Sequence, residues 1–151
     1  MLKPMYYYSG REFAQAGTYS IIWCLGNPAV WLTMLAGMIF TLVMCIKEKL
    51  RDREKLTVIV SFLAQYLPWV LVPRSMYIYH YFASIPFMIM SICFAAKHFG
   101  RAYPRATRVV AIAIMLLAIA MFALFYPAIS GAPCSQAQLD LINLFLPKDL
   151  Y

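Results

Sequence analysis

The chain has 151 residues, of which 64% are hydrophobic and only 13% are charged, and its formal net charge is +7. A soluble domain is about 45–50% apolar and about 25% charged, so this composition excludes an ordinary soluble fold. The length allows about four membrane spans of ~20 residues with short loops. We therefore expect an all-α integral membrane protein with four transmembrane helices, an interfacial N-terminal segment and a C-terminal tail.

The first 27 residues form a mixed segment ahead of the first apolar run. This segment has neither the apolar core nor the small-residue cleavage site of a signal peptide. The run Tyr6–Tyr8 and the indole of Trp23 favour a segment that lies at the membrane interface. Gly26-Asn27-Pro28 then predicts a turn and the start of a helix, because proline is favoured in the first helical turn.

Four apolar runs follow. We predict transmembrane helices at about 28–46, 56–72, 81–99 and 109–129, which makes residues 28–130 the four-helix region. Pro68 is expected to kink the second helix, and Pro86 falls in the early turns of the third. A break at Ser130-Gly131-Ala132-Pro133 ends the fourth helix and starts the tail, residues 131–151. Part of this tail is weakly amphipathic and predicts a short interfacial helix.

The cations predict how the chain is oriented. The loops 47–55 and 97–108 together hold nine of the 13 lysines and arginines. Cytoplasmic loops of membrane proteins carry an excess of lysine and arginine, so we expect both loops to be cytoplasmic. The N-terminal segment, the 73–84 corner and the C-terminus would then be extracytoplasmic. We expect no nucleic-acid partner, because no basic face carries exposed aromatic residues between its cations.

The stretch 65–86 concentrates the residues with chemical potential. It combines three prolines with a tryptophan, four tyrosines, an arginine and a histidine between two apolar runs. Arg74 follows Pro73 at the depth of lipid headgroups, and its guanidinium suits a phosphate. Arg74 is therefore either a ligand of a lipid-linked phosphate or an interface anchor that reaches any headgroup.

The same stretch supplies His80 and a group of aromatic side chains. His80 is a candidate phosphate ligand or proton carrier, or else a hydrogen-bonded histidine of an aromatic belt. Candidates to line a substrate groove are Trp69, Tyr77, Tyr79 and Tyr81. Tyr79 and Tyr81 could stack on the apolar face of a sugar, and the alternative for both is a place in the interfacial belt.

No residue of this sequence is an evident catalytic group. The six acids form no recognisable pair, and they are Glu12, Glu48, Asp52, Glu54, Asp140 and Asp149. No cysteine and histidine spacing fits zinc, so we expect no metal and no cofactor. A disulfide between Cys24 and Cys134 stays open, because both could fall on the same side of the membrane.

An ordered set of short motifs resembles the C-terminal four-span region of the protein O-mannosyltransferases, over nearly the whole chain. These motifs are Met5-Tyr6-Tyr7-Tyr8, Gly26-Asn27-Pro28-Ala29-Val30-Trp31, Tyr66-Leu67-Pro68-Trp69, Arg74, Tyr79-His80-Tyr81-Phe82, Pro86-Phe87, Ser130-Gly131 and Leu146-Pro147. Two details depart from the family: Leu32 follows Trp31 where a second tryptophan is common, and the tail lacks its usual tryptophans.

The resemblance implies a glycosyltransferase that moves mannose from a dolichyl- or polyprenyl-phosphate carrier to serine or threonine of a protein. This lipid-linked donor would be the substrate, and the acceptor protein and the missing N-terminal spans would be partners. The resemblance also implies that the catalytic acid lies in a first extracytoplasmic loop, which nothing here matches. We therefore expect a C-terminal piece of such an enzyme that is inactive alone and contributes a donor-lipid groove, with Arg74 and His80 on the phosphate.

Two other functions remain open from the sequence. The chain could be a non-catalytic membrane subunit or regulator of a transferase. It could also be a small unrelated transporter component, although transporters place polar residues or broken helices near the middle of the membrane. The first and fourth apolar runs contain almost no such residues.

Overall fold

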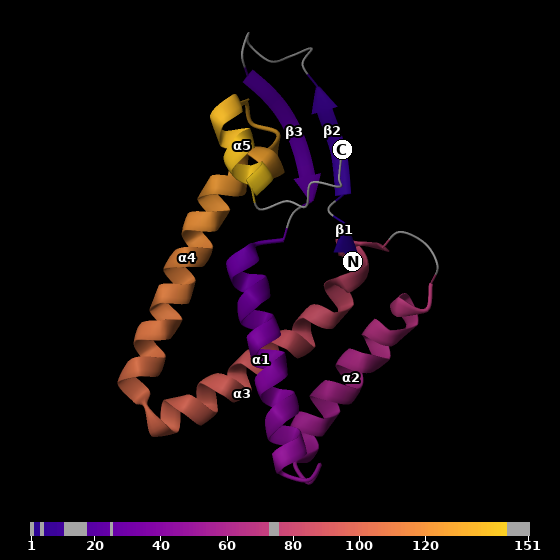
Figure 1. Cartoon of the computed structure of the whole chain (residues 1–151), viewed down its shortest axis with the longest axis vertical. Helices are drawn as coiled ribbons and strands as arrows, with labels where there is room; N and C mark the ends of the chain where they lie inside the picture. Colours follow the sequence, from indigo (N-terminus) through magenta and orange to yellow (C-terminus); the bar gives the residue numbers. More distant parts are fainter. Residues whose placement is uncertain (1, 4, 11–17, 25, 73–75, 145–151) are drawn as a thin grey trace.

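The computed structural model describes every residue except 1, 4, 11–17, 25, 73–75 and 145–151. Four long helices make up most of the molecule, and a small sheet with a short helix covers one end (Figure 1). In chain order the elements are β1 (Leu2–Lys3), β2 (Met5–Gly10), β3 (Thr18–Cys24), α1 (Pro28–Lys47), α2 (Arg53–Val70), β4 (Met76–Tyr77), the 3-10 helix η1 (Ile78–Ser84), α3 (Ile85–Ala102), α4 (Pro104–Ser130), β5 (Cys134–Ser135) and α5 (Gln136–Leu144).

Among the residues that the structure describes, three helices are long and apolar enough to cross a membrane: α1, the continuous helix Tyr79–Ala102, and α4. The expected all-α membrane fold is therefore confirmed for the spanning region. The 18 residues of α2 open with Arg53, Glu54 and Lys55, so its apolar part starts at Leu56. At ~1.5 Å per residue this apolar part covers about 22 Å, which is short for a hydrocarbon core of about 30 Å.

The centre of the bundle is the contact between α1 and α3, and α3 also packs against α2 and α4. Small side chains allow the two helices to approach closely. A Cβ added to Gly37 of α1 would lie 3.0 Å from the backbone nitrogen of Ile92 in α3. One and two turns further along α1, Thr41 and Cys45 are fully buried, and so is Ser91 of α3.

The polar atoms of this contact are satisfied locally. The Thr41 hydroxyl donates to the carbonyl oxygen of Gly37 at 2.9 Å, and the Ser91 hydroxyl donates to that of Phe87 at 3.0 Å. Both bonds run back four residues along their own helix, so the helices carry buried hydroxyls without orphaned donors. Two longer contacts also cross between the helices: the Thr41 hydroxyl donates to the Ser91 carbonyl oxygen at 3.5 Å, and the Ser91 hydroxyl donates to the Met38 sulfur at 3.5 Å. Packing of small residues, with these two contacts, therefore holds α1 against α3.

The sheet is the main feature that the sequence analysis did not predict. The strands β2 and β3 are antiparallel, and β3 also pairs with β5, so that Tyr19 lies opposite Cys134. Three tyrosines stand in β2, and β3 combines aromatic with β-branched residues, which suits a pleated surface. The N-terminal segment and the tail are thus joined in one sheet, which lies at the end of the bundle that carries α5 (Figure 1).

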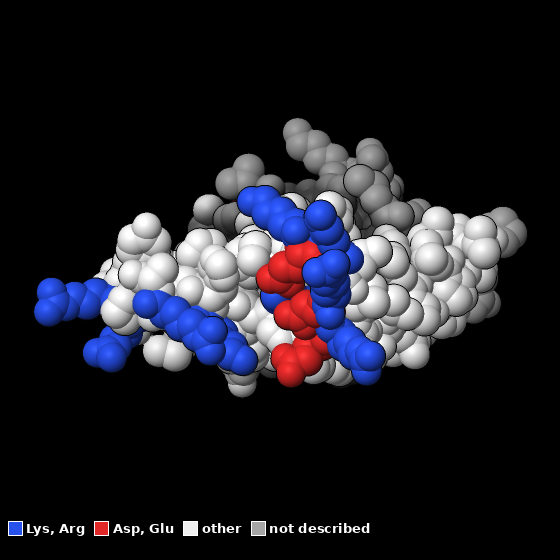
Figure 2. Space-filling view, turned by 90° about the horizontal axis from the view of Figure 1, so that it is seen from below, with Lys and Arg blue, Asp and Glu red and all other residues white. Residues whose placement is uncertain are grey.

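The opposite end of the bundle carries most of the charged side chains that the structure describes, and Figure 2 looks onto that end. The α1–α2 loop is closed by Lys55, whose ammonium lies 2.7 Å from a Glu48 carboxylate oxygen and 2.9 Å from one of Asp52. Asp52 also caps α2 by accepting the backbone N–H groups of Glu54 and Lys55. The bond from Lys55 lowers the pKa of Asp52, and the bonds to Asp52 and Glu48 raise the pKa of Lys55.

Candidate functional site

The candidate site surrounds η1, the 3-10 helix that leads into α3. Its sequence, Ile-Tyr-His-Tyr-Phe-Ala-Ser, places four aromatic rings on consecutive residues, so the rings point in different directions around the axis. The following Pro86 lies in the first turn of α3, where its missing N–H is tolerated. The end of α2, with Trp69, packs beside η1.

His80 is held between two aromatic rings. Its imidazole centroid lies 4.6 Å from that of Trp69, with the rings at 65°, and 4.0 Å from that of Tyr79, with the rings at 29°. His80 is half-buried and Tyr79 is 45% exposed. The cluster of Trp69, Tyr79 and His80 therefore combines an oriented imidazole with an accessible aromatic surface, and we call it the His80 cluster.

Tyr81 lies inside the bundle instead. It is 8% exposed, its ring stacks on Trp31 at a centroid distance of 4.9 Å, and the edges of Phe62 and Tyr66 meet it. Its hydroxyl donates to the Met88 sulfur at 2.9 Å. The ring and the hydroxyl of Tyr81, predicted to line a groove, both make their contacts inside the core.

The motif Gly26-Asn27-Pro28 connects this core to α4. The Asn27 side-chain oxygen accepts the backbone N–H groups of Ala29 and Val30 and so caps α1. Its amide nitrogen donates to the carbonyl oxygen of Ala118 in α4 at 2.8 Å. A Cβ on Gly26 would overlap the indole of Trp31, so glycine is needed for Trp31 to reach Tyr81.

Two of the predicted site residues are described incompletely or not at all. Arg74 lies outside the described residues. Tyr77 is described by its backbone only, in β4, which pairs in parallel with β1 so that Lys3 lies opposite Tyr77. No local pattern in the sequence gives Lys3 a role, although the charge count predicts the same side of the membrane for Lys3 and Arg74.

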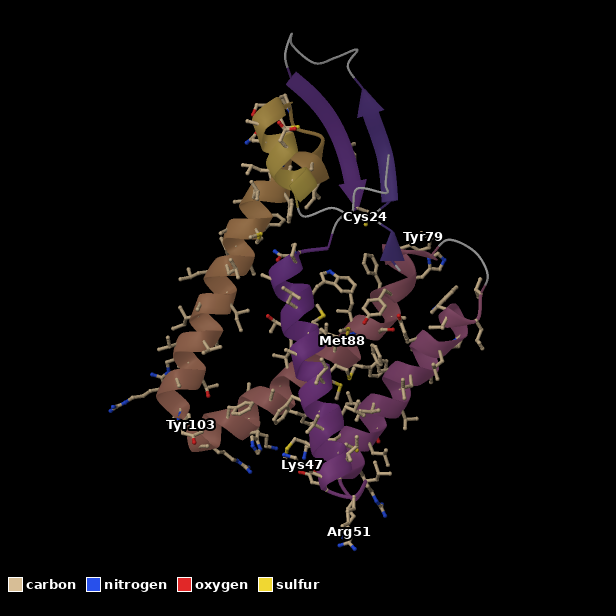
Figure 3. The ribbon with its side chains drawn as sticks, in the orientation of Figure 1. Cys24, Lys47, Arg51, Tyr79, Met88 and Tyr103 are labelled. Atoms are coloured by element: carbon tan, nitrogen blue, oxygen red, sulfur yellow. The ribbon has the colours of Figure 1, made fainter. Side chains whose placement is uncertain are left out.

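The His80 cluster and the charged loops lie at opposite ends of the helices. Figure 3 labels Tyr79 near β1 at one end, and Lys47, Arg51 and Tyr103 at the other. Within the described part of the chain, no three histidine, cysteine, aspartate or glutamate side chains gather as metal ligands. Of the acids on the side of the His80 cluster, only Asp140 is described, and it is exposed on α5.

The disulfide that the sequence left open is not formed. Cys24 and Cys134 are both free thiols, although their strands β3 and β5 are paired. The pair in register is Tyr19 and Cys134, and Cys24 lies at the far end of β3. Burial raises the pKa of the Cys134 thiol, so this cysteine stays protonated near neutral pH.

Comparison with known proteins identifies relatives of the chain. Residues 1–146 match the family described as the C-terminal four TMM region of protein-O-mannosyltransferase. Two curated relatives, from Mycobacterium tuberculosis strains CDC 1551 / Oshkosh and ATCC 25618 / H37Rv, are each named polyprenol-phosphate-mannose--protein mannosyltransferase. Each is 28% identical to the chain over 158 residues, which cover 97% of the chain and 30% of the relative. No solved structure matches.

Proposed function

The chain belongs to the family of C-terminal four-transmembrane regions of protein O-mannosyltransferases, and we propose that it forms the donor-lipid side of an enzyme that transfers mannose from a polyprenyl-phosphate carrier to serine or threonine of proteins. It spans 30% of the length of the curated relatives. We therefore propose the mannose transfer, the acceptor protein and the catalytic acid for the whole enzyme. In that enzyme this chain packs against further membrane spans.

The observation that carries the proposal is the His80 cluster at one end of the membrane helices. A lipid-linked donor keeps its polyprenyl chain among the helices and its phosphate at headgroup depth. A site for it needs a hydrogen-bond donor or a cation at that depth, with an apolar or aromatic wall below. The imidazole of His80, held by the rings of Trp69 and Tyr79, fits this requirement.

Each residue has a stated role in the proposal. Arg74 and His80 contact the donor phosphate, and Trp69, Tyr77 and Tyr79 line the groove. Tyr81 does not contact the donor in this proposal. Its ring stacks on Trp31 and so holds η1 against α1. The enzyme needs no cofactor in this proposal, since the carrier itself brings the activated sugar.

The same proposal fixes the orientation. The donor side, with the N-terminal segment, the 73–84 corner and the C-terminus, is extracytoplasmic, and the loops 47–55 and 97–108 are cytoplasmic. The charge distribution supports this, because the described cations apart from Lys3 all belong to those two loops.

The test uses the native polypeptide that contains this chain, with transfer from polyprenyl-phosphate-mannose to an acceptor peptide measured over a range of donor concentrations. We expect Arg74→Ala and His80→Ala each to raise the donor KM about tenfold or more, since each removes a hydrogen bond to a charged group. Trp69→Leu should raise it less, by loosening His80. Tyr103→Leu, at the other end of the helices, is the control and should leave the KM unchanged.

The KM and kcat values separate the proposed role from a structural one. Loss of a phosphate contact made before the reaction raises KM, whereas a misfolded enzyme loses active molecules and lowers the apparent kcat at unchanged KM. An unchanged donor KM in both Arg74→Ala and His80→Ala would contradict the proposed phosphate site.

A further inference from the structure

The corner between α3 and α4 is a basic surface that the mannosyl transfer does not use. Tyr103 is the only residue between the two helices. Four cations surround it and all are exposed: Lys97, Arg101, Arg105 and Arg108. Residues 97–108 contain no aspartate or glutamate.

The cations of this corner stand next to one another in pairs. Lys97 and Arg101 are four residues apart on α3, and Arg105 and Arg108 are three apart on α4, so each pair shares one face of its helix. Like charges at these spacings repel each other. The second pair also lies in the first turns of α4, where the helix dipole disfavours cations. The cations of the corner therefore repel one another, and a bound anion would reduce this repulsion.

The α1–α2 loop at the same end of the bundle shows the contrast. It places Glu48, Asp52 and Glu54 among its five cations, and the two ion pairs found in the described residues are both made there, by Lys55. In Figure 2 the red acidic side chains lie among one group of blue side chains, while the blue side chains away from that group have none beside them. The acids of the loop thus offset three of its five cations, whereas the corner has no acid to offset any of its four.

The position of the corner indicates that the anion is the headgroup of an anionic phospholipid. It joins two of the helices that are long and apolar enough to cross the membrane, so it lies where those helices leave the bilayer. Tyr103 is 65% exposed and the neighbouring Phe99 is 45% exposed, and aromatic side chains of this kind favour the membrane interface. Phospholipid headgroups fill that layer, and the anionic ones carry the opposite charge.

We propose that the α3–α4 corner binds the headgroups of anionic phospholipids, and that its occupancy holds α4 in place. The second part follows from packing. Only 6% of the α4 span is buried in the molecule, against 33% of the α1 span, and its buried residues Phe125 and Ala128 lie toward the end away from the corner. A headgroup shared by Lys97, Arg101, Arg105 and Arg108 would bridge the first turns of α4, where no residue is buried, to the last turns of α3.

The experiment measures lipid binding to the native polypeptide that contains this chain, purified in detergent. Phosphatidylglycerol and phosphatidylcholine of equal chain length are titrated, and bound lipids are counted by native mass spectrometry. We expect a preference for phosphatidylglycerol. The variant Lys97→Gln/Arg101→Gln/Arg105→Gln/Arg108→Gln should weaken phosphatidylglycerol binding about tenfold or more, because each cation near an anionic headgroup contributes to its attraction.

The matched control is Lys47→Gln/Lys49→Gln/Arg51→Gln/Arg53→Gln, which removes the same number of exposed cations from the α1–α2 loop. It should change phosphatidylglycerol binding less than about threefold, because the acids of that loop already screen its cations. Circular dichroism of both variants checks that the helices are intact. Equal losses in the two variants, or no loss in the corner variant, would overturn the proposal.

Two further measurements exclude other anions and test the effect on α4. Inorganic phosphate at millimolar concentration should not displace phosphatidylglycerol, and displacement would mean that the corner is a site for free phosphate. Phosphatidylglycerol should slow hydrogen exchange of the first turns of α4 in the wild type but not in the corner variant. Exchange that does not respond to the lipid would refute the link to α4.

Discussion

The helices α1 and α4 are both long and apolar, yet the molecule holds them in opposite ways. A third of the α1 span is buried, mainly along its contact with α3, whereas α4 buries 6% of its span and is held near Ala118, Phe125 and Gly131. The apolar content of a helix in a membrane does not determine its partners, because lipid is as apolar as leucine. Close approach through small residues and a few polar contacts decides the packing here.

The largest effect is expected where α1 meets α3. Gly37→Leu places a bulky side chain where even a Cβ would lie 3.0 Å from the backbone of Ile92, so the helices must separate. We expect a loss of about 3 kcal/mol in the free energy of unfolding, measured by denaturant titration in mixed micelles. Gly100→Leu is the matched control, because a Cβ there meets only the Thr107 methyl at 4.0 Å. An equal loss in the control would refute the close contact.

The next effect is expected at the bond between the start of α1 and the middle of α4. Asn27→Ala removes the cap of α1 and the bond to the Ala118 carbonyl, and should cost about 2 kcal/mol. Asn27→Ser keeps a capping hydroxyl but lacks the amide N–H, so it should cost about 1 kcal/mol. If the serine variant is as stable as the wild type in the same titration, the bond to α4 contributes nothing.

The smallest of the three effects is expected where α4 ends against the sheet. Gly131 has a φ of 76°, and a Cβ there would lie 3.1 Å from the side chain of Ile22 in β3. Gly131→Ala should therefore cost about 1–2 kcal/mol, mostly because L-residues avoid this backbone conformation. Adding Ile22→Ala removes the contact but not the strain, so the double variant should recover only a small part of that cost. Full recovery would mean that the contact, not the backbone, disfavours alanine.

Local signals made the helices predictable from the sequence. Asn27-Pro28 caps α1 as the turn pattern indicated, and Gly131 ends α4 in the left-handed conformation that glycine allows. The strands were missed although β2 and β3 are neighbours in the chain. The second partner of β3 is β5, which comes from the other end of the chain and leaves no local signal. Residues 5–10, which form β2, show no clear alternation of apolar and polar side chains, so the sequence alone shows no strand signal there.

The candidate site likewise combines features that the sequence predicts with features that it does not. The position of the aromatic residues near one end of the helices could be read from the sequence. The different contacts of His80 and Tyr81 could not be predicted from the sequence. They depend on the direction in which each ring leaves η1, and on Trp31, which comes from α1. Lys3 was overlooked for a similar reason, since only the register of β1 with β4 brings it beside Tyr77.

The pairing of β3 with β5 also sets an order of assembly. β5 follows α4 in the chain, so β3 can gain this partner only after all four helices have been synthesised. Until then β3 can pair only with β2, and its other edge stays open to incorrect pairing with another chain. Contacts between distant segments form slowly, so closure of this sheet is expected to be the last and slowest step of folding. A ribosome that stalls within α4 would leave a membrane-inserted chain with that edge uncovered.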